Sequence, residues 1–563
     1  MAEKNLTSLS SKLTTSVWSL RFAAILTLIM GVTNLLSSLT PAFRDRLLKL
    51  RELLPMGISN GSRLATALAG FALILLAFQL FRRKRVAWYF TEGLLLLSSL
   101  THLFKGLDFE ETLFALLLAG WLFIIRFQFH ARSDAFSIRQ GLIALGAATV
   151  FTALYGTVGF ALFAHHFRTH FNFWQALQQT LVMFTSFNDP GVTPASNFGR
   201  YFIDSIYFIA IATFGYAIYM IIRPVLVRQP ASPADREIAR KTIHLHGSTI
   251  LAPFALLPDK SYSFSKKGSV IDYVVQGRIA LALGDPIGPS MDISKAIHEF
   301  KTHCIQNDWL PAFVDIPSDH LSAFAKQGFR SLTIGHEAVV NLENFSLEGS
   351  CNKDLRYVFN KFTKLGYTTE VFTTKIPTKV KSDLREVSDD WLTTRKGVEK
   401  RFWVGWFDEA YLDCWPMMIA RDLEGKLMAF GNILSAYNEP VATVDMMRHS
   451  PKAESGVMEY LFISMFLWAR ENGFKQFDLG LCALAGVGTD PQDAAGEKAI
   501  HYLYEHMTSF FDFQGLHHFK EKFHPEWQPR YLAFPSYSNL PGIIWALTRA
   551  DSNRMPITGE FIR

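Results

Sequence analysis

The sequence predicts a membrane-anchored protein with an α-helical transmembrane bundle followed by a soluble α/β domain. Two observations lead to this expectation. The chain has 563 residues and is 49% hydrophobic, but its long apolar runs all lie before about Arg228. After that residue, charged side chains recur every few positions and strand-like patterns alternate with helix-like patterns, which is typical of α/β domains.

Six apolar stretches in the first part are long enough to cross a hydrocarbon core of about 30 Å. They lie approximately at 17–39, 64–81, 86–104, 112–129, 139–164 and 202–222. A further stretch, Phe173–Phe187, contains three glutamines and is expected to lie in the membrane interface. We therefore assign residues 1–228 to a transmembrane domain of about six helices.

Basic residues in the loops indicate the orientation of this bundle. Arg82, Arg83, Lys84 and Arg85 lie between the second and third stretches, and further arginines flank the turn after the fourth. Because cytoplasmic loops carry an excess of lysine and arginine, both chain termini are expected on the cytoplasmic side. The basic segment 44–51 falls on the opposite side in this scheme and is expected to lie along the membrane surface.

Composition narrows the chemistry of the soluble part. The net charge of +6 suits an anionic partner such as phospholipid headgroups or RNA. The four cysteines show no paired spacing, which argues against a disulfide framework and a zinc site. No HExxH, GxSxG or Walker A motif stands at a suitable strand–turn–helix site, so we expect no metal and no cofactor.

The soluble part is expected to begin after a linker at 229–240, which starts with the sequence PASP. Two successive units with a similar order of elements suggest a duplicated fold. Strands are expected at 269–275, 279–283, 312–316, 367–373, 426–436, 441–447, 477–481 and 530–534, and helices at 294–307, 318–327, 353–365, 381–395, 456–472 and 499–510.

Seven motifs in this part carry a resemblance to a known family. They are GDPIG (284–288), GHEAVVNLENFSLEG (335–349), EKRFWVGWFDEAYL (399–412), DMMR (445–448), GVMEYLF (456–462), DLGLCALAGVG (478–488) and FKEKFHPEWQPRYL (519–532). Together they make the region from about 240 to 540 resemble the synthase domain of the bacterial aminoacyl-phosphatidylglycerol synthases. These lysyl- or alanyl-phosphatidylglycerol transferases are also called multiple peptide resistance factors.

The resemblance implies two tandem acetyltransferase-like (GNAT) folds, at 241–350 and 351–545, with a C-terminal tail at 546–563. It also implies a multi-pass protein of the bacterial inner membrane. This protein would transfer an aminoacyl group from aminoacyl-tRNA to a lipid, foremost phosphatidylglycerol, and so change surface charge and resistance to cationic peptides. Full-length members carry a larger membrane region with a flippase, so we expect a synthase with a shortened anchor.

The family points to three catalytic residues in this sequence, namely Asp445, Arg448 and Lys520. Asp445 is expected to orient or deprotonate the lipid hydroxyl, and Arg448 to bind a phosphate or stabilise the oxyanion. The alternative for this pair is a structural ion pair at a strand end. Lys520 is expected to bind a phosphate, on one face of a strand together with Lys522 if the segment is extended.

Further residues are substrate-binding candidates. Glu399, Lys400 and Arg401 precede an aromatic run and are expected to contact the amino acid or the headgroup. Glu505 is a candidate for a substrate amine, and Lys522 for a phosphate. The alternatives are a loop packed on the core, a surface glutamate and a solvated lysine.

Other functions remain open at this stage. The acceptor of the aminoacyl group can be phosphatidylglycerol, diacylglycerol, another lipid or a peptide. A non-catalytic transporter or sensor is disfavoured because the apolar stretches carry few ionisable groups. The amino acid transferred, product flipping and a homo-oligomeric state are not determined by these patterns.

Overall fold

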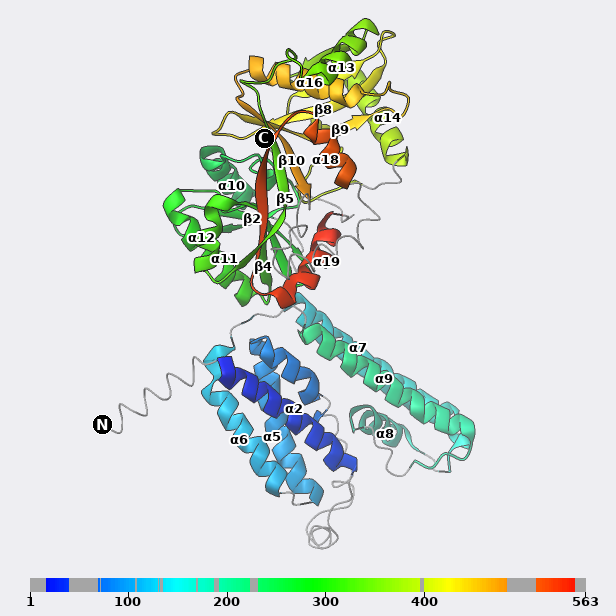
Figure 1. Cartoon of the computed structure of the whole chain (residues 1–563). Helices are drawn as coiled ribbons and strands as arrows, with labels where there is room; N and C mark the ends of the chain where they lie inside the picture. Colours follow the sequence, from blue (N-terminus) through cyan, green and yellow to red (C-terminus); the bar gives the residue numbers. More distant parts are fainter. Residues whose placement is uncertain are drawn as a thin grey trace, which may run out of the picture. The chain divides into compact units, whose positions relative to one another are not determined.

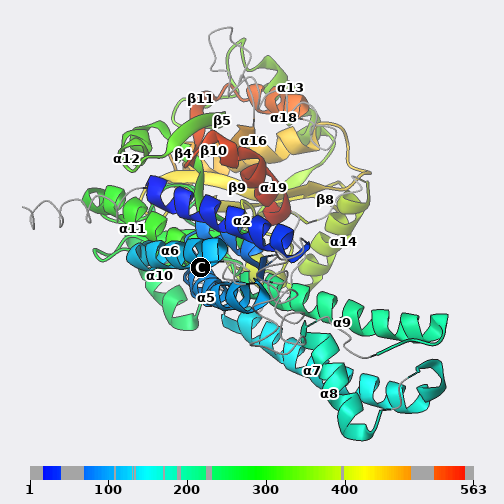
Figure 2. The same ribbon diagram turned by 90° about the horizontal axis from the view of Figure 1, so that it is seen from below.

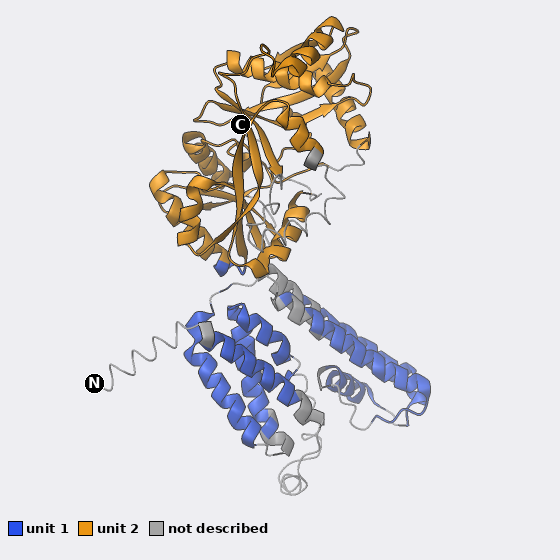
Figure 3. Ribbon diagram, viewed as in Figure 1, with its two compact units in different colours: residues 1–226, 305–308 blue, residues 227–304, 309–563 orange. Residues whose placement is uncertain are grey.

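The computed structural model describes two compact units (Figure 1, Figure 3). The first comprises Met1–Leu226 with Ile305–Asp308, and the second Val227–Cys304 with Trp309–Arg563. Within these units the structure describes residues 17–39, 69–70, 72–106, 109–129, 131, 135–168, 171–186, 192–222, 231–394, 399–483 and 513–551.

The first unit is built from helices that coincide with most of the expected apolar stretches. Its described helices are α2 (Val17–Leu39), a helical segment at 72–81, α5 (Arg85–Gly106), α6 (Phe109–Ile124), α7 (Ala135–Leu162), α8 (Phe173–Ser186) and α9 (Asn197–Ile222). Helix α8 occupies the stretch expected in the interface. No helix in the described part of the chain is both long and apolar enough to cross a membrane, so the transmembrane character of this unit stays a prediction.

Helices α7 and α9 lie side by side along much of their length (Figure 2). Their close approach depends on a glycine. A Cβ atom added at Gly159 of α7 would lie 2.2 Å from the ring of Phe202 on α9. A side chain at Gly159 would force the Phe202 ring to shift, so glycine allows the ring to pack in this position.

The second unit contains one mixed sheet of 11 strands in the order β1-β2-β3-β4-β11-β5-β10-β9-β8-β7-β6. The strands are β1 (Ser261–Phe264), β2 (Val270–Gln276), β3 (Ile279–Leu283), β4 (Leu310–Pro317), β5 (Arg330–Asn341), β6 (Thr368–Phe372), β7 (Met417–Arg421), β8 (Leu427–Ser435), β9 (Val441–His449), β10 (Gln476–Ala483) and β11 (Glu526–Phe534). Two neighbouring pairs are parallel, β3 with β4 and β9 with β10, and the other pairs are antiparallel.

The two halves of this sheet exchange strands at their junction. Strand β11 comes from the end of the chain, yet it pairs with β4 on one side and β5 on the other. Strand β5 comes from the first half, yet it pairs with β10 of the second half. Each half therefore completes the sheet of the other, and the sheet runs without a break through both expected subdomains.

Helices cover the sheet as amphipathic layers. They are α10 (Pro233–His246), α11 (Ile293–Gln306), α12 (Leu321–Lys326), α13 (Lys353–Lys364), α14 (Thr378–Thr394), the short α15 (Glu409–Leu412), α16 (Val457–Glu471), α18 (Phe513–Glu521) and α19 (Leu540–Asp551). One core includes α14, α19 and the 402–415 segment, and a second core lies under α13, α16 and α18. The two cores involve opposite sides of the second half of the sheet (Figure 1).

Local sequence explains how these helices begin and which face they bury. Ser232 caps α10 by accepting a hydrogen bond from the Asp235 N–H at 3.1 Å, and Pro233 follows at the first helical position. Helix α10 thus occupies most of the segment expected as a linker. In α11, buried Ile293, Ile297, Phe300 and Cys304 recur at helical spacing and form its inner face.

The packing of the second core predicts that the protein loses stability when Phe466 of α16 is truncated. This fully buried ring lies 5.0–6.1 Å from the rings of Phe345, Phe462, Phe477 and Phe523. We expect Phe466→Ala to cost about 3–5 kcal/mol because it leaves a cavity in this cluster. The measurement is the denaturant midpoint of the purified chain in detergent. Tyr357→Ala on α13, where the side chain is 68% exposed, is the control, and equal midpoints for the two variants would contradict the assignment.

Candidate functional site

The candidate site lies where the parallel strands β9 and β10 separate. Their ladder comprises three pairs and ends at Thr443 and Asp478, although β9 continues to His449 and β10 to Ala483. The Thr443 hydroxyl donates a hydrogen bond to the Asp478 carbonyl at 2.8 Å at this last pair. Beyond this pair, the described parts of β9 and β10 do not pair with each other.

A β-bulge in β9 brings Asp445 and Arg448 to the same face. Gly431 of β8 pairs with Met447 and Ile433 pairs with Val444, so two residues of β9 stand opposite Asn432 alone. The Asn432 Oδ1 atom accepts the Met446 N–H at 2.7 Å and occupies the irregular position. In a regular strand, residues three apart point to opposite faces, and the extra residue removes this alternation.

Asp445 is a buried carboxylate with several partners. Both of its oxygens accept the Gly405 N–H at 3.0 Å, and Oδ2 accepts the Tyr411 hydroxyl at 2.5 Å. Burial raises the pKa of Asp445 to about 6, while the contacts with Tyr411, Gly405, Asn432 and Arg448 oppose this rise. The carboxylate is therefore ionised at neutral pH and still basic enough to accept a proton.

Arg448 is oriented by α14 and by Glu399. Its Nη1 donates to the Ser388 hydroxyl, and its Nη2 donates to Glu399 Oε2 at 2.7 Å. The guanidinium carbon lies 5.3 Å from the centre of the Trp391 ring. With a side chain only 6% exposed, Arg448 is a rigidly held cation beside Asp445.

Lys520 lies on the β10 side of the separated strands. Its Nζ donates to the Gly480 carbonyl at 2.8 Å and to the Leu481 carbonyl at 3.2 Å. Burial lowers the pKa of Lys520 to about 8, and Cys482, Asp478 and Asp315 oppose this shift. The expectation that Lys520 and Lys522 share one face of an extended strand is wrong, because α18 is helical through Glu521. Lys522 instead pairs with Glu459 at 2.7 Å.

Behind Lys520, buried acidic residues gather where β4, β5, β10 and β11 meet. Arg530 donates to Glu337, and its Nε lies 3.7 Å from Asp315 Oδ1. Burial raises the pKa of Asp315 to about 6 and that of Asp478 to about 7. These groups surround Lys520 with negative potential and keep its ammonium in place.

The other candidates from the sequence lie elsewhere. Lys400 pairs with Asp551 at 3.5 Å, and Arg401 stacks on Trp406 at 4.9 Å, so both are engaged beside α19 and the aromatic run. Glu505 and the 486–488 glycine cluster lie outside the described residues. Of the named residues, the structure brings Glu399, Asp445 and Arg448 together. Lys520 lies on α18 and contacts carbonyls of β10, the strand next to β9.

Sequence reasoning did not identify the residues that hold Asp445. A Cβ atom at Gly405 would lie 2.2 Å from the Tyr411 ring and 2.6 Å from Asp445 Oδ2, so a larger residue here would displace the two side chains that meet at this N–H. Gly405 and Tyr411 both fall within the 399–412 motif, but their contacts with Asp445 span 40 and 34 residues of sequence. A single sequence gives no signal for such long-range pairs.

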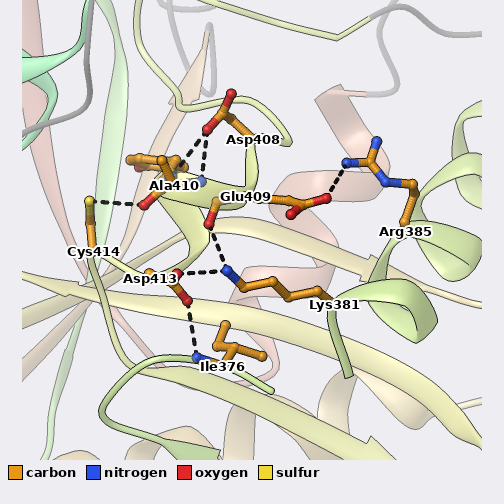
Figure 4. Close-up of polar contacts among 9 residues, drawn as sticks. Ile376, Lys381, Arg385, Asp408, Glu409, Ala410, Asp413 and Cys414 are labelled. Carbon is orange, nitrogen blue, oxygen red and sulfur yellow. Dashed lines mark hydrogen bonds and ion pairs between the residues drawn. The ribbon is translucent and has the colours of Figure 1, made fainter. Parts of the chain in front are cut away.

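A polar clamp fixes the short helix that carries Tyr411 (Figure 4). Asp408 caps α15 by accepting the Ala410 N–H at 2.9 Å. From α14, Lys381 donates to Asp413 at 2.6 Å, and Arg385 donates to Glu409 at 3.1 Å. These contacts hold both ends of α15, and from this helix the Tyr411 hydroxyl donates to Asp445.

Among the side chains that the structure describes, no group of three or more His, Cys, Asp or Glu residues is placed to hold an ion. The site instead combines a buried carboxylate, a guanidinium and an ammonium, which can move a proton and stabilise an anion.

The second unit is an α/β domain built on one mixed sheet with a separated pair of parallel strands, and an α/β domain is what the sequence predicts. The sequence profile described as "Phosphatidylglycerol lysyltransferase, C-terminal" matches residues 240–534, and the chain belongs to this family.

Curated relatives and solved structures agree with this assignment. The phosphatidylglycerol lysyltransferase of Bacillus subtilis is 28% identical over 87% of this chain and 55% of its own length. The enzyme of the same name from Staphylococcus xylosus is 31% identical over 50% of this chain and 33% of its own length. The chain thus spans about half, or less, of the length of these relatives. The structure of L-PGS from Bacillus licheniformis matches with a TM-score of 0.52 and 31% identity, covering 57% of this chain and 98% of that one. The C-terminal domain of a putative lysylphosphatidylglycerol synthetase from Agrobacterium fabrum gives the same TM-score and identity. This match covers 58% of this chain and 99% of that domain.

The contact between Tyr411 and Asp445 predicts a pH effect. The tyrosine hydroxyl lowers the pKa of Asp445, so Tyr411→Phe should raise it further above its usual range. If catalysis needs the ionised carboxylate, the acidic limb of the activity profile moves to higher pH. The variant then loses more activity at pH 6 than at pH 8, relative to the unmodified chain. Tyr460→Phe, which removes a hydroxyl bond to the Tyr367 carbonyl, is the control, and an equal loss at both pH values would refute the effect.

Substitutions of the two lysines in the FKEKF segment are expected to have different effects on activity. Lys520→Met removes a buried ammonium from the separated strands and is expected to lower activity roughly 100-fold, the size of effect typical for a charged group that stabilises a transition state. Lys522→Met breaks an exposed pair with Glu459 and should change activity less than about twofold. Turnover of both purified variants is measured beside their thermal midpoints. If the two variants had similar activities and similar thermal midpoints, the assignment of Lys520 to the site would be wrong.

Proposed function

We propose that this chain transfers an aminoacyl group from aminoacyl-tRNA to a glycerol hydroxyl of phosphatidylglycerol. The observation that carries the proposal is the Asp445–Arg448 pair beside the separated strands β9 and β10, inside the segment matched by the family profile. The curated relatives are named phosphatidylglycerol lysyltransferases, which makes lysine the first amino acid to test.

The proposed reaction exchanges one ester for another. The lipid hydroxyl oxygen attacks the aminoacyl carbonyl, forms the new C–O bond and gives up its proton. In this proposal Asp445 accepts or directs that proton, and its pKa of about 6 supports the role because the carboxylate is then ionised at neutral pH. Collapse of the tetrahedral intermediate breaks the bond to the tRNA ribose, and the ribose oxygen takes up a proton.

The reaction also requires cations that stabilise negative charge on the intermediate and on the substrates. The intermediate carries an oxyanion, and both substrates carry phosphates. Arg448, held by Ser388 and Glu399, supplies a fixed planar donor for either group. Lys520 supplies a second positive charge from the β10 side. Since these groups are held in position before substrate binds, little reorganisation is needed during the reaction.

The location of the protein belongs to the same proposal. The apolar stretches of residues 1–228 would anchor the chain in the bacterial inner membrane with both termini in the cytoplasm, where aminoacyl-tRNA is found. Confinement to the membrane surface raises the effective concentration of the lipid at the site. Tandem acetyltransferase-like subdomains at 241–350 and 351–545 remain part of this proposal, joined by the exchanged strands β5 and β11.

Lipid analysis tests the proposed function. Expression in a bacterium without aminoacylated lipids should produce phosphatidylglycerol whose mass is increased by one aminoacyl group. Asp445→Ala and Arg448→Ala should remove this species while the protein stays in the membrane fraction, because each deletes a charged group of the site. Arg421→Ala on β7 is the matched control and should keep the product. Unmodified phosphatidylglycerol in cells that contain the intact protein would refute the acceptor, and full product from both site variants would refute the site.

A further inference from the structure

The segment Glu399–Gly405 lies along the site and contacts it at both ends. Glu399 accepts the Arg448 guanidinium at 2.7 Å. Six residues later, the Gly405 N–H binds both oxygens of Asp445. The orientation of the two site residues therefore depends on the path of one short segment of chain.

The midpoint of this segment has an unfavourable backbone conformation. Phe402 has a φ of +75°, a value in the left-handed region that residues with a large side chain rarely adopt. Its ring is fully buried and packs against Trp403 at 5.2 Å. Such a conformation persists only where surrounding contacts hold it.

Lys260 supplies that contact from the first half of the sheet domain. It lies just before β1 and is fully buried. Its Nζ donates a hydrogen bond to the Phe402 carbonyl and lies 4.5 Å from the centre of the Phe402 ring. Asp259 Oδ2 lies 3.9 Å away, and the buried carboxyl group of Asp272 also interacts with the ammonium.

We propose that Lys260 is a positioning residue for the candidate site. By holding the Phe402 carbonyl, it keeps the strained Glu399–Gly405 segment in the path that directs Gly405 at Asp445 and Glu399 at Arg448. The inference deepens the proposed function and rests on it for its kinetic consequences. It gives the first half of the domain a direct role in the geometry of a site located in the second half.

The chain offers a matched control for this interaction. Lys301 also donates its Nζ to a backbone carbonyl, that of Gln327, at 2.6 Å, and lies 5.4 Å from the Phe329 ring. Its contacts connect α11 with the turn before β5 and involve none of the site residues. A lysine-to-methionine change at each position therefore removes the same kind of bond, but only one of them affects the Glu399–Gly405 segment.

The experiment compares Lys260→Met with Lys301→Met in the full chain. Hydrogen exchange of peptides that contain Gly405 should be faster in Lys260→Met alone, because the N–H donated to Asp445 loses its fixed position. We expect kcat to fall roughly 100-fold, since displacing reacting groups by about 1 Å has effects of that size. KM should stay within about threefold, because no substrate contact is removed.

The pH profile adds a readout that loss of fold does not produce. Tyr411, Asn432, Arg448 and the Gly405 N–H surround Asp445, and Gly405 is one of the contacts that lower its pKa. Without that N–H, the acidic limb of activity moves to higher pH in Lys260→Met and stays in place in Lys301→Met.

A second variant covers the case in which Lys260→Met fails to fold. The double variant Lys260→Met/Asp272→Asn removes the fully buried carboxylate that would otherwise lose its cation, so the cost of leaving Asp272 uncompensated no longer adds to the loss of the carbonyl bond. Unchanged exchange at Gly405 in a folded variant would overturn the proposal, and so would equal kcat values for the Lys260 and Lys301 variants. If the intact chain makes no aminoacylated lipid, the proposed function fails, while the exchange comparison still decides the role of Lys260.

Discussion

The structure of the site depends on one requirement, which is to keep an ionised carboxylate inside a largely apolar sheet. An isolated buried carboxylate takes up a proton because burial disfavours its charged form. Asp445 avoids full neutralisation through the Gly405 N–H, the Tyr411 hydroxyl and the neighbouring Arg448. The 399–412 segment, the clamp around α15 and the bulge in β9 all serve these few contacts.

The exchanged strands explain why a site in the second half needs the first half. Strand β11 completes the first half and β5 completes the second, so neither half has its full sheet without the other. Lys520 lies on α18, directly before β11, and its ammonium is surrounded by Asp315 from β4 and Asp478 from β10. The charge around Lys520 is therefore set by residues from both halves.

Sequence patterns predicted the order of most elements and placed Asp445 and Arg448 together, but they could not predict how these residues share a face. That arrangement depends on the bulge opposite Asn432, and a bulge is determined by pairing with another strand. Strands β1, β5 and β7 were not expected either. Strand β5 lies where no strand was predicted, yet it is central because β10 and β11 both pair with it. Local alternation also failed for Lys520 and Lys522, since Lys520 lies on α18 with a buried ammonium, whereas Lys522 follows the end of that helix and pairs with Glu459.

On the proposed function, the two titratable groups on either side of the separated strands are complementary at neutral pH. Asp445, with a pKa of about 6, is mostly ionised there, and Lys520, with a pKa of about 8, is mostly protonated. Burial drives both shifts toward neutrality, so one group becomes a stronger base and the other a stronger acid than it is in water. Environments that move two pKa values toward the working pH are a common way to assign base and acid within one site. Ester exchange needs such a pair, because one hydroxyl loses a proton while another gains one. Under the proposed function, one group of this pair would accept the proton of the attacking hydroxyl and the other would return a proton to the departing ribose oxygen.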